Sequence, residues 1–443
     1  MLRRMFLVAT LVTVSFASAL DGAEVSYWNF DNTFNDSTGT RNLTGAGATS
    51  FSTIAAPGVG GSASLDVSGG GNGATYDVLG TDAVSGPWSV ALWARGNTGG
   101  NVGSFFGTRG PSDMSFDAKW DTGARIHGDI GSGGVWLTTA ADVAFDNQAN
   151  NWHHVAYSVT PTGYTIYGNG QFLASGSYGA STPLLFNSTH DIAVGANSTA
   201  LGENFDGRVD EVHVYNHAIS QAEVWALLQP ANTTQISSLY NTGVNNAGVP
   251  LANGAADPHY ALIAQPAPGG LSDQVLTSAG GFPIGPWLGD NSTSAWIAAN
   301  GNADGEGPAG NYTWRTTFDL IGDPATSIIE GVWATDNGAV DILINGMSVG
   351  TGQLSSSHNI WTPFLIDSGF VYGINTLDFV VNNLVVGSPN PTGLRVQMTG
   401  FAGNLPPPSV AVPEPTSIAL WLLVSGFVMV YVLRGKQRPG GCP

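Results

Sequence analysis

The sequence has 443 residues, and its 32 acidic residues against 13 basic ones give a formal net charge of −19. Five of the basic residues flank the two ends of the chain, which leaves eight in the region between them and a net charge there of −24. A surface of this sign repels nucleic acid and anionic lipid, and no basic stripe is present that could follow a phosphate backbone. The composition therefore excludes nucleic-acid binding.

A single cysteine, Cys442, stands near the end of the sequence, so no disulfide can form within the region before it. That region must be stabilised by burial, and its length predicts two or three domains at about 150 residues each. The chain holds 61 glycines, and short alternating runs rich in Thr, Val, Tyr and Trp recur along it. These runs predict an all-β architecture of two tandem antiparallel β-sandwich (jelly-roll) domains, with a helix only over residues 221–228.

The first segment has the order of a secretory signal. Arg3 and Arg4 precede an apolar run from Met5 to Phe16, and the small residues Ala17-Ser18-Ala19 follow. A positive region, an apolar region and a small-residue cleavage site in this order predict a signal peptide over residues 1–19, cut after Ala19. We therefore expect an exported protein.

Residues 20–229 form the first predicted domain. Alternating runs such as Glu24–Asp31, Ser89–Ala94 and Trp152–Ser158 follow one another, separated by Gly-rich turns. Asn169-Gly170 is a typical two-residue hairpin turn. Many short strands without intervening helices predict two sheets enclosing one core.

The motifs of this domain occur in a recognisable order. They are Trp28–Asp31, Asp36–Gly39, Trp88–Trp93, Asn151–Val155, Tyr167–Gly170 and Phe205–Tyr215, closed by the short helical segment Ala218–Val224. Together they resemble the LamG-like jelly roll of the concanavalin A-like lectin/glucanase superfamily. The resemblance implies a carbohydrate- or protein-binding module, which in this family often carries one structural calcium ion.

Three carboxylates are the candidate calcium ligands. Asp31 and Asp36 lie near the first strand and Asp210 near the last, and these strands commonly lie close together in this fold. Calcium takes several oxygen ligands from carboxylates and carbonyls. The alternative is that Asp31 and Asp36 make ordinary turn hydrogen bonds and that Asp210 is an exposed strand end.

Three aromatic residues are candidates for stacking on a sugar ring. Trp120, Trp136 and Tyr178 lie in Gly- or Ser-rich surroundings and combine an apolar face with a polar group. Packing in the core or in a loop is the alternative for each of them. They are the candidate ligand-binding residues of the first domain.

Catalysis is the alternative that the superfamily raises, because it includes glucanases. Retaining glycosidases need two carboxylates about 5 Å apart, and the glucanase relatives place them on one strand as Glu-x-Asp-x-Glu or a slightly longer variant. No such motif is present, and the nearest run, Asp206–Glu211, places Asp210 and Glu211 on opposite strand faces. We therefore expect no enzymatic activity.

Residues 232–403 form the second predicted domain. Tyr312, Trp314, Thr316 and Phe318 alternate with polar residues, and Asn345-Gly346 predicts another hairpin. The Phe-Asp-Leu, Thr-Asp-Asn and Asn-Thr-Leu-Asp-Phe segments resemble galactose-binding-like jelly rolls. In that family ligand sites usually lie in loops at one end of the sandwich, which implies Asp336 and Asn337 as ligand residues here; the alternative is that they only shape a turn.

The final segment has three parts. A proline-rich spacer over residues 404–415 ends in Pro413-Glu414-Pro415, an uncharged run follows over residues 416–433, and the basic tail 434–443 begins with Arg434. The run is long enough for a transmembrane helix, and its basic flank marks the cytoplasmic side. This combination resembles the PEP-CTERM sorting signal of Gram-negative bacteria, which implies processing by an exosortase; a plain single-pass anchor is the alternative.

The sequence thus predicts an exported protein of the cell envelope or cell surface, tethered at first to the inner membrane by the C-terminal helix or released from it. Its expected role is non-catalytic binding of a polysaccharide or another matrix component. The expected partners are that glycan, an exosortase-type enzyme and the membrane, and structural calcium is the only expected cofactor. A structural or protein-interaction role without sugar binding is the alternative, and glycoside hydrolysis is less favoured.

Overall fold

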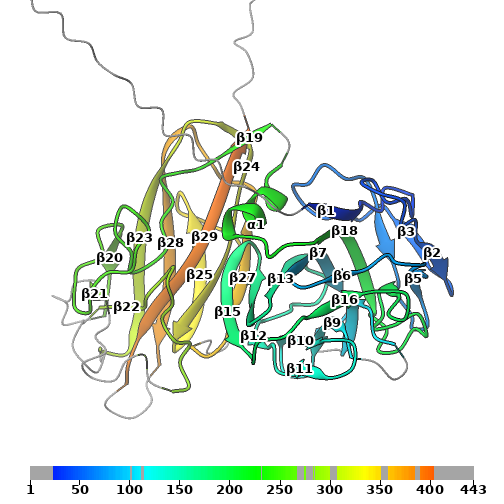
Figure 1. Ribbon diagram of the computed structural model, residues 1–443. Helices are drawn as coiled ribbons and strands as arrows, with labels where there is room; N and C mark the ends of the chain where they lie inside the picture. Colours follow the sequence, from blue (N-terminus) through cyan, green and yellow to red (C-terminus); the bar gives the residue numbers. More distant parts are fainter. Residues whose placement is uncertain are drawn as a thin grey trace, which may run out of the picture. The chain divides into compact units, whose positions relative to one another are not determined.

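The computed structural model describes residues 23–99, 102–110, 114–230, 232–266, 274–275, 283, 285–299, 307–350, 358–384 and 390–403 (Figure 1). The predicted signal peptide 1–19, the spacer 404–415, the uncharged run 416–433 and the tail 434–443 lie outside these residues. So do the sorting residues Pro413, Glu414, Pro415 and Arg434. Within the described ranges, every helix is too short or too polar to span a bilayer.

Eighteen strands in the described residues between Glu24 and Tyr215 form the first group of sheets (Figure 1). Their bounds are β1 Glu24–Trp28, β2 Thr44–Ala46, β3 Ser50–Ser52, β4 Ser64–Asp66, β5 Gly73–Tyr76, β6 Val84–Ser85, β7 Trp88–Gly96, β8 Gly103–Gly107, β9 Phe116–Asp121, β10 Arg125–Gly131, β11 Trp136–Thr138, β12 Val143–Ala144, β13 His153–Thr160, β14 Gly163–Gly168, β15 Gln171–Ser177, β16 Leu184–Phe186, β17 Ile192–Val194 and β18 Gly207–Tyr215.

Two eight-stranded sheets and one small sheet arise from these strands. The first has the order β15-β14-β13-β7-β18-β4-β3, with β1 paired to β18, and the second has the order β11-β10-β9-β8-β17-β5-β2, with β12 paired to β10. β16 and β6 form a two-stranded sheet. All pairings between these named strands are antiparallel.

The two large sheets enclose one core. Trp88 of the first sheet packs edge-on against Phe116 of the second at a centroid distance of 4.7 Å, and Phe116 packs against Tyr157 of the first at 5.4 Å. All three side chains are buried. Buried apolar surface contributes about 25 cal/mol per Å², so contacts of this kind hold the two sheets face to face.

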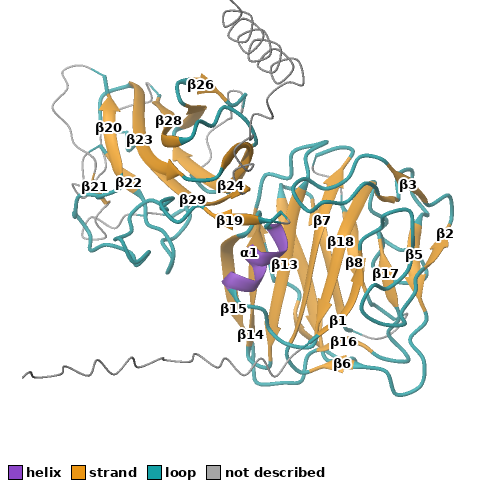
Figure 2. Ribbon diagram, turned by 90° about the horizontal axis from the view of Figure 1, so that it is seen from above, coloured by secondary structure: helices purple, strands orange, loops and turns teal. Residues whose placement is uncertain are grey.

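The predicted helix is confirmed as α1, Gln221–Leu228 (Figure 2). The Ser220 side chain accepts a hydrogen bond from the Glu223 amide, and the Glu223 carboxylate in turn accepts one from the Ser220 amide, which makes a capping box. Val224 and Leu228 are buried in a cluster with Trp93 of β7. The helix is thereby fixed on the face of the first sheet that points away from the core.

Eleven further strands in the part of the chain that the structure describes form the second group of sheets. Their bounds are β19 Thr233–Gln235, β20 Tyr260–Ala264, β21 Gln274–Val275, β22 Ile297–Ala298, β23 Gly310–Leu320, β24 Asp323–Asp336, β25 Gly338–Ile344, β26 Met347–Ser348, β27 Thr362–Ile366, β28 Gly373–Asn383 and β29 Gly393–Gly403. One sheet has the order β21-β22-β29-β24-β27, with β19 paired to β29, and the other has the order β20-β23-β28-β25-β26.

These two sheets also enclose a core. Trp333 of β24 packs against Phe379 of β28 at 5.9 Å, and Phe364 of β27 contacts the same ring at 5.9 Å. On β23 the residues predicted to face inward are buried, and Arg315 on the other face pairs with Asp378, with Nε to Oδ1 at 2.6 Å. The expected all-β fold is therefore confirmed, as two β-sandwiches. The boundary at residues 229–232 and the galactose-binding-like resemblance stay predictions.

Candidate functional site

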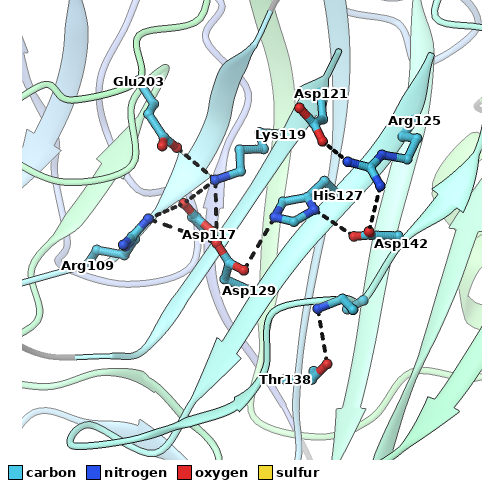
Figure 3. Close-up of polar contacts among 12 residues, drawn as sticks. Arg109, Asp117, Lys119, Asp121, Arg125, His127, Asp129, Thr138, Asp142 and Glu203 are labelled. Carbon is cyan, nitrogen blue, oxygen red and sulfur yellow. Dashed lines mark hydrogen bonds and ion pairs between the residues drawn. The ribbon is translucent and has the colours of Figure 1, made fainter. Parts of the chain in front are cut away.

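Charged side chains form two facing rows on β9 and β10 (Figure 3). The antiparallel register places Asp117 opposite Asp129, Lys119 opposite His127 and Asp121 opposite Arg125. Successive residues of a strand point to opposite faces, so these side chains share the face that points away from the core. We call this set, together with Arg109, Asp142, Glu203 and Trp136, the charged face.

The inward positions of the same two strands explain why the rows are regular. Phe116, Ala118 and Trp120 alternate with the charged residues of β9 and are buried in the core. On β10 the inward position 128 is a glycine, and a Cβ there would lie 2.6 Å from the Tyr157 ring. The turn between the strands has positive φ at Gly123 (100°) and Ala124 (54°), which lets the chain reverse over three residues.

Lys119 lies at the centre of the charged face and is only 6% exposed. Its Nζ donates to Glu203 Oε2 at 2.8 Å and to Asp117 Oδ2 at 3.2 Å, and it lies 3.4 Å from Asp129 Oδ2 (Figure 3). Burial alone would lower the pKa of Lys119, but the Asp117 charge and the other carboxylates raise it above its ordinary value. The ammonium therefore stays charged and holds three carboxylates together.

Asp117 and Asp129 behave as a pair with opposite shifts. Burial raises the pKa of Asp117, which is fully buried, to about 6. Burial also acts on Asp129, but hydrogen bonds from His127 and Asp117 and the charge of Lys119 lower the pKa of Asp129 below its ordinary value. Asp117 Oδ1 is buried and accepts no hydrogen bond within the described part of the chain. A proton taken up by the pair therefore belongs on Asp117.

A second group of ion pairs continues along the strands. His127 contacts Asp129 through Nε2 at 3.3 Å and Asp142 through Nδ1 at 2.6 Å. Arg125 pairs with Asp142 at 3.1 Å and with Asp121. Burial lowers the pKa of His127, but the hydrogen bond to Asp129 and the neighbouring carboxylates raise it above the ordinary value. The carboxylates thus stabilise the imidazolium form of His127 relative to that of a free histidine.

Two segments from elsewhere in the sequence form the rim. Arg109, after β8, lies over the Trp136 ring at 5.0 Å and reaches Asp117 Oδ2 at 3.3 Å. The Ser104 amide of β8 donates to the Glu203 carbonyl at 2.7 Å, which brings the Glu203 carboxylate to Lys119. The Ser104 hydroxyl is buried and has no hydrogen-bond partner among the described residues. The rim therefore presents one half-buried indole ring, whereas the Ser104 hydroxyl is buried and does not reach the rim.

The charged face can position hydrogen-bond donors and acceptors, and its geometry does not resemble that of a glycosidase. A glycosidase needs two carboxyl groups that flank the scissile bond, one of them free to attack or to activate water. Asp117 and Asp129 instead both contact the Lys119 ammonium group, at 3.2 and 3.4 Å. Ion-pair networks shift pKa values without any catalytic role.

The three candidate aromatic residues have different positions. Trp120 is 2% exposed and packs parallel to Phe145 at 5.9 Å, so it belongs to the core and leaves no ring face for a sugar. Tyr178 is half-buried and donates from its hydroxyl to the Thr160 carbonyl at 2.6 Å, and burial raises its pKa to about 12. Trp136 is half-buried and is the candidate that the structure brings to the charged face.

Asp36 makes the turn hydrogen bonds that were the alternative to a calcium ligand. Its Oδ1 accepts from the Tyr27 and Thr38 amides, each at 3.0 Å, and its Oδ2 accepts from the Arg41 amide at 3.2 Å. Burial opposes ionisation, but these hydrogen bonds lower the pKa of Asp36 overall. Both carboxylate oxygens of Asp36 therefore accept backbone hydrogen bonds, as the alternative expects, and its role as a calcium ligand stays a prediction.

The carboxylates of Asp31, Asp210 and Glu211 lie near one another. A Cβ at Gly61 would lie 3.3 Å from Glu211 Oε1 and 3.5 Å from Asp31 Oδ1. Burial, with the charges of Glu211 and Asp31, raises the pKa of Asp210 to about 8, although the Ala56 amide donates to its Oδ2 at 2.9 Å. No group of three or more His, Cys, Asp or Glu in the described ranges is placed to hold a metal ion. Calcium binding stays a prediction.

Asp336 and Asn337 lie where β24 ends, in the second sandwich. Burial raises the pKa of Asp336 to about 7, and Asn337 Nδ2 donates to its Oδ1 at 2.7 Å. Asn337 Oδ1 in turn accepts from the Leu384 amide at 2.9 Å and from Asn390 Nδ2 at 2.7 Å. These contacts connect segments of the same sandwich, which is the shaping role named as their alternative.

The charged face itself was not among the predicted sites. Its signal is present in the sequence as charged residues alternating with apolar ones over Phe116–Asp121 and again over Arg125–Asp129. Two consecutive runs of this kind, separated by a Thr-Gly-Ala turn, predict a hairpin with one charged face. No local sequence pattern of this kind predicts that Glu203 belongs to the charged face.

Comparison with known protein families identifies the first sandwich. Residues 68–225 match the concanavalin A-like lectin/glucanases superfamily. The matched range contains the strands β5 to β18 and the whole charged face. The superfamily predicted for the first domain is thereby confirmed over these residues. The PEP-CTERM resemblance stays a prediction.

Several solved structures are similar in part. Domain 4 of an extracellular arabinanase from Geobacillus stearothermophilus, in complex with arabinotriose, is 21% identical over 47% of this chain and 99% of that domain, with a TM-score of 0.36. The CBM40 of the Ruminococcus gnavus IT-sialidase bound to α2,3-sialyllactose is 13% identical over 35% and 96%, with a TM-score of 0.26. A pentraxin from Limulus polyphemus is 13% identical over 41% and 81%, with a TM-score of 0.29. These scores are too low to support an inference about function. No curated protein is significantly similar in sequence.

Proposed function

We propose that the protein binds glycans without catalysis, through the charged face of its first sandwich. The observation that carries the proposal is that residues 68–225, which match a lectin/glucanase superfamily, hold a dense and preorganised set of polar groups on one sheet face. Charged donors and acceptors form stronger hydrogen bonds than neutral ones. Sugar hydroxyls both donate and accept, so they suit a surface that offers both kinds of group.

Preorganisation favours binding because less side-chain entropy is lost when the ligand arrives. The Lys119 ammonium and the His127 ring are held by two or more carboxylates each. Ordering a free side chain at an interface costs roughly 0.5–1.5 kcal/mol, and these side chains are ordered already. Trp136 adds an apolar ring at the rim, and aromatic rings stack on apolar faces.

The non-catalytic role rests on the carboxylates. The buried Asp117 is shared between Lys119 and Arg109, and Asp129 is shared between Lys119 and His127. Neither is free to act as a nucleophile or to activate water at a glycosidic bond. A polysaccharide incubated with the purified full chain should therefore stay intact. Turnover that survives repurification and disappears in Asp129→Asn would contradict this part of the proposal.

Export, sorting and calcium belong to the same proposal and rest on the sequence. The signal peptide and the Pro413-Glu414-Pro415 segment would deliver the sandwiches to the envelope or beyond, with an exosortase acting on the C-terminal segment. Calcium would bind as a structural ion at Asp31 and Asp210, and carbonyl oxygens would have to complete its ligand set, because no group of three or more His, Cys, Asp or Glu in the described residues is placed to hold a metal. Ion binding there would tie the first strand to the last.

A structural or protein-interaction role is the second candidate, and one observation favours it. The ionic groups of the charged face are largely satisfied by one another, as in a network that only stabilises the sheet. Such a network would give the same fold and no affinity for sugar. Binding assays therefore separate the two candidates.

The test is affinity electrophoresis of the full chain in gels that contain soluble polysaccharides, followed by calorimetry on those that retard it. Trp136→Ala should weaken binding roughly two- to tenfold, because an aromatic contact contributes about 0.5–1.5 kcal/mol. Arg315→Met, on the outer face of the second sandwich, is the matched control and should leave binding unchanged. Failure of every polysaccharide to bind would overturn glycan binding and favour the second candidate.

A further inference from the structure

The cations of the charged face are all committed to carboxylates of the protein. Lys119 is shared by three carboxylates, and Arg109, Arg125 and His127 by two each. Five carboxylates thus face three permanently charged cations and one histidine; they are Asp117, Asp121, Asp129, Asp142 and Glu203. An incoming anion would find no cation that is not already paired.

Two buried polar groups at the floor of the site lack a hydrogen-bond partner among the described residues, and they favour a ligand group that can donate a hydrogen bond over an anion. Asp117 Oδ1 and Ser104 Oγ are both buried without a hydrogen-bond partner in the part of the chain that the structure describes. Ser104 is the register partner of Lys119 and Asp117 stands two residues before Lys119, so both adjoin the buried ammonium. The buried Asp117 Oδ1 lacks a hydrogen-bond donor, and a sugar hydroxyl of the ligand can supply one. An anionic ligand group could only add another acceptor.

The carboxylates also reach the surface. The Glu203 side chain is 38% exposed, and it pairs with Lys119 from the rim. A uronate or sulfate placed beside it would meet a like charge, and like-charge juxtaposition costs several kcal/mol. The region between the basic flanks carries −24, so the long-range field adds to this repulsion while the ligand approaches.

We propose that the charged face selects uncharged, hydroxyl-rich polysaccharides and rejects polyanionic ones. Glu203 is the specificity-determining residue, because it is the exposed carboxylate nearest the buried ammonium. This inference rests on the proposed glycan binding and adds the chemical class of the ligand. Selectivity of this kind arises from an unfavourable contact with the wrong ligand as well as from contacts with the right one.

The experiment compares neutral and acidic probes on the full chain. The neutral probes are dextran, galactomannan and mixed-linkage glucan, and the acidic ones are polygalacturonate and alginate. At low salt, about 0.01 M, the Debye length is about 30 Å and the repulsion is largest. We expect at least one neutral polymer to bind with little dependence on salt, and the polyuronates to bind at least about tenfold more weakly, as a like-charge contact requires.

Two variants test the role of Glu203. Glu203→Lys reverses its charge and should strengthen polygalacturonate binding by about tenfold or more at low salt, an effect that salt removes. Asp319→Lys makes the same change of net charge on the exposed outer face of the second sandwich and should not do so. If both variants gain polyuronate binding equally, net charge and not the charged face sets the preference, and the assignment of Glu203 is wrong.

The outcomes also separate this inference from the proposed function. Absence of binding to every probe overturns glycan binding and the selectivity with it. Polyuronates that bind the unaltered chain as tightly as the neutral polymers overturn the selectivity alone. Circular dichroism of each variant checks that the sheets are intact, and a folded Glu203→Lys without gain in polyuronate binding also counts against the inference.

Discussion

Lys119→Met would remove the ammonium that Asp117, Asp129 and Glu203 share, while keeping a side chain of similar length. Two of these carboxylates are nearly or fully buried and cannot reach water when the ammonium is gone. Removing one partner of a buried ion pair typically costs about 3–5 kcal/mol, because the other charge is left uncompensated. The free energy of unfolding should fall by about this amount near pH 8.

The stability loss caused by Lys119→Met should depend on pH, and the direction of that dependence follows from the pKa of Asp117. In the unaltered protein the pKa of Asp117 is already raised to about 6, and Lys119 is one of the groups that hold it down. Without Lys119 it rises further. A carboxyl group with a raised folded pKa contributes stability below its unfolded pKa and loses it as the pH rises through the folded value. The variant should therefore lose stability more steeply than the unaltered protein above about pH 5, and the deficit at pH 5 should be smaller than at pH 8.

Urea unfolding followed by tryptophan fluorescence at the two pH values measures both effects. Arg125→Met is the matched control, because it also removes a cation from the charged face but its side chain is 40% exposed. Exposed ion pairs contribute about 0–1 kcal/mol. If the two variants lose the same stability at pH 8, or if the Lys119→Met deficit does not shrink on acidification, the description of Lys119 as a buried counter-ion is refuted.

Three further predictions concern other parts of the first sandwich. Trp120→Ala should lower the free energy of unfolding by about 3–5 kcal/mol, whereas Trp136→Ala should change it by less than about 1 kcal/mol, and equal losses would contradict the core position of Trp120. Asp210→Asn should raise the free energy of unfolding at about pH 9 by roughly 1–3 kcal/mol. The raised pKa of Asp210 makes the unaltered protein lose stability as the pH approaches 8, whereas the amide of the variant cannot ionise. A variant that is no more stable than the unaltered protein at that pH would show that burial does not destabilise the carboxylate. Millimolar calcium should raise the melting temperature by about 2–4 °C, and Asp31→Asn should abolish the rise; an unchanged melting curve of the unaltered protein would remove the calcium hypothesis.

The fold was largely accessible from the sequence, because local patterns determine most of it. The alternation over Tyr312–Phe318 gave the inward face of β23, and a capping Ser220 with Glu223 three residues later is a standard helix start. Trp120 shows where local composition misleads. Its Gly-containing surroundings suggested exposure, whereas its parity with Phe116 along β9 places it in the core.

The candidate site depends on contacts that no local pattern encodes. Glu203 is 84 residues from Lys119 in sequence, and their contact follows from the pairing of β8 with β9 and from the loop that contacts β8. Asp31 and Asp210 are likewise far apart in the sequence and close together in the fold. A register irregularity between Asp210 and His213, with Glu211 at φ 49°, breaks the alternation that predicted opposite faces for Asp210 and Glu211.

The charged rows of β9 and β10 also bear on how the chain reaches its fold. A slip of one residue in the pairing would carry Asp117, Lys119 and Asp121 into the core and bring Phe116 and Trp120 to the opposite face. Each stranded charge would cost several kcal/mol, so mispaired sheets are strongly disfavoured during folding. The residues proposed to hold the glycan thus also enforce the correct strand register. A redesign of ligand preference would have to keep a charged or strongly polar side chain at these three positions.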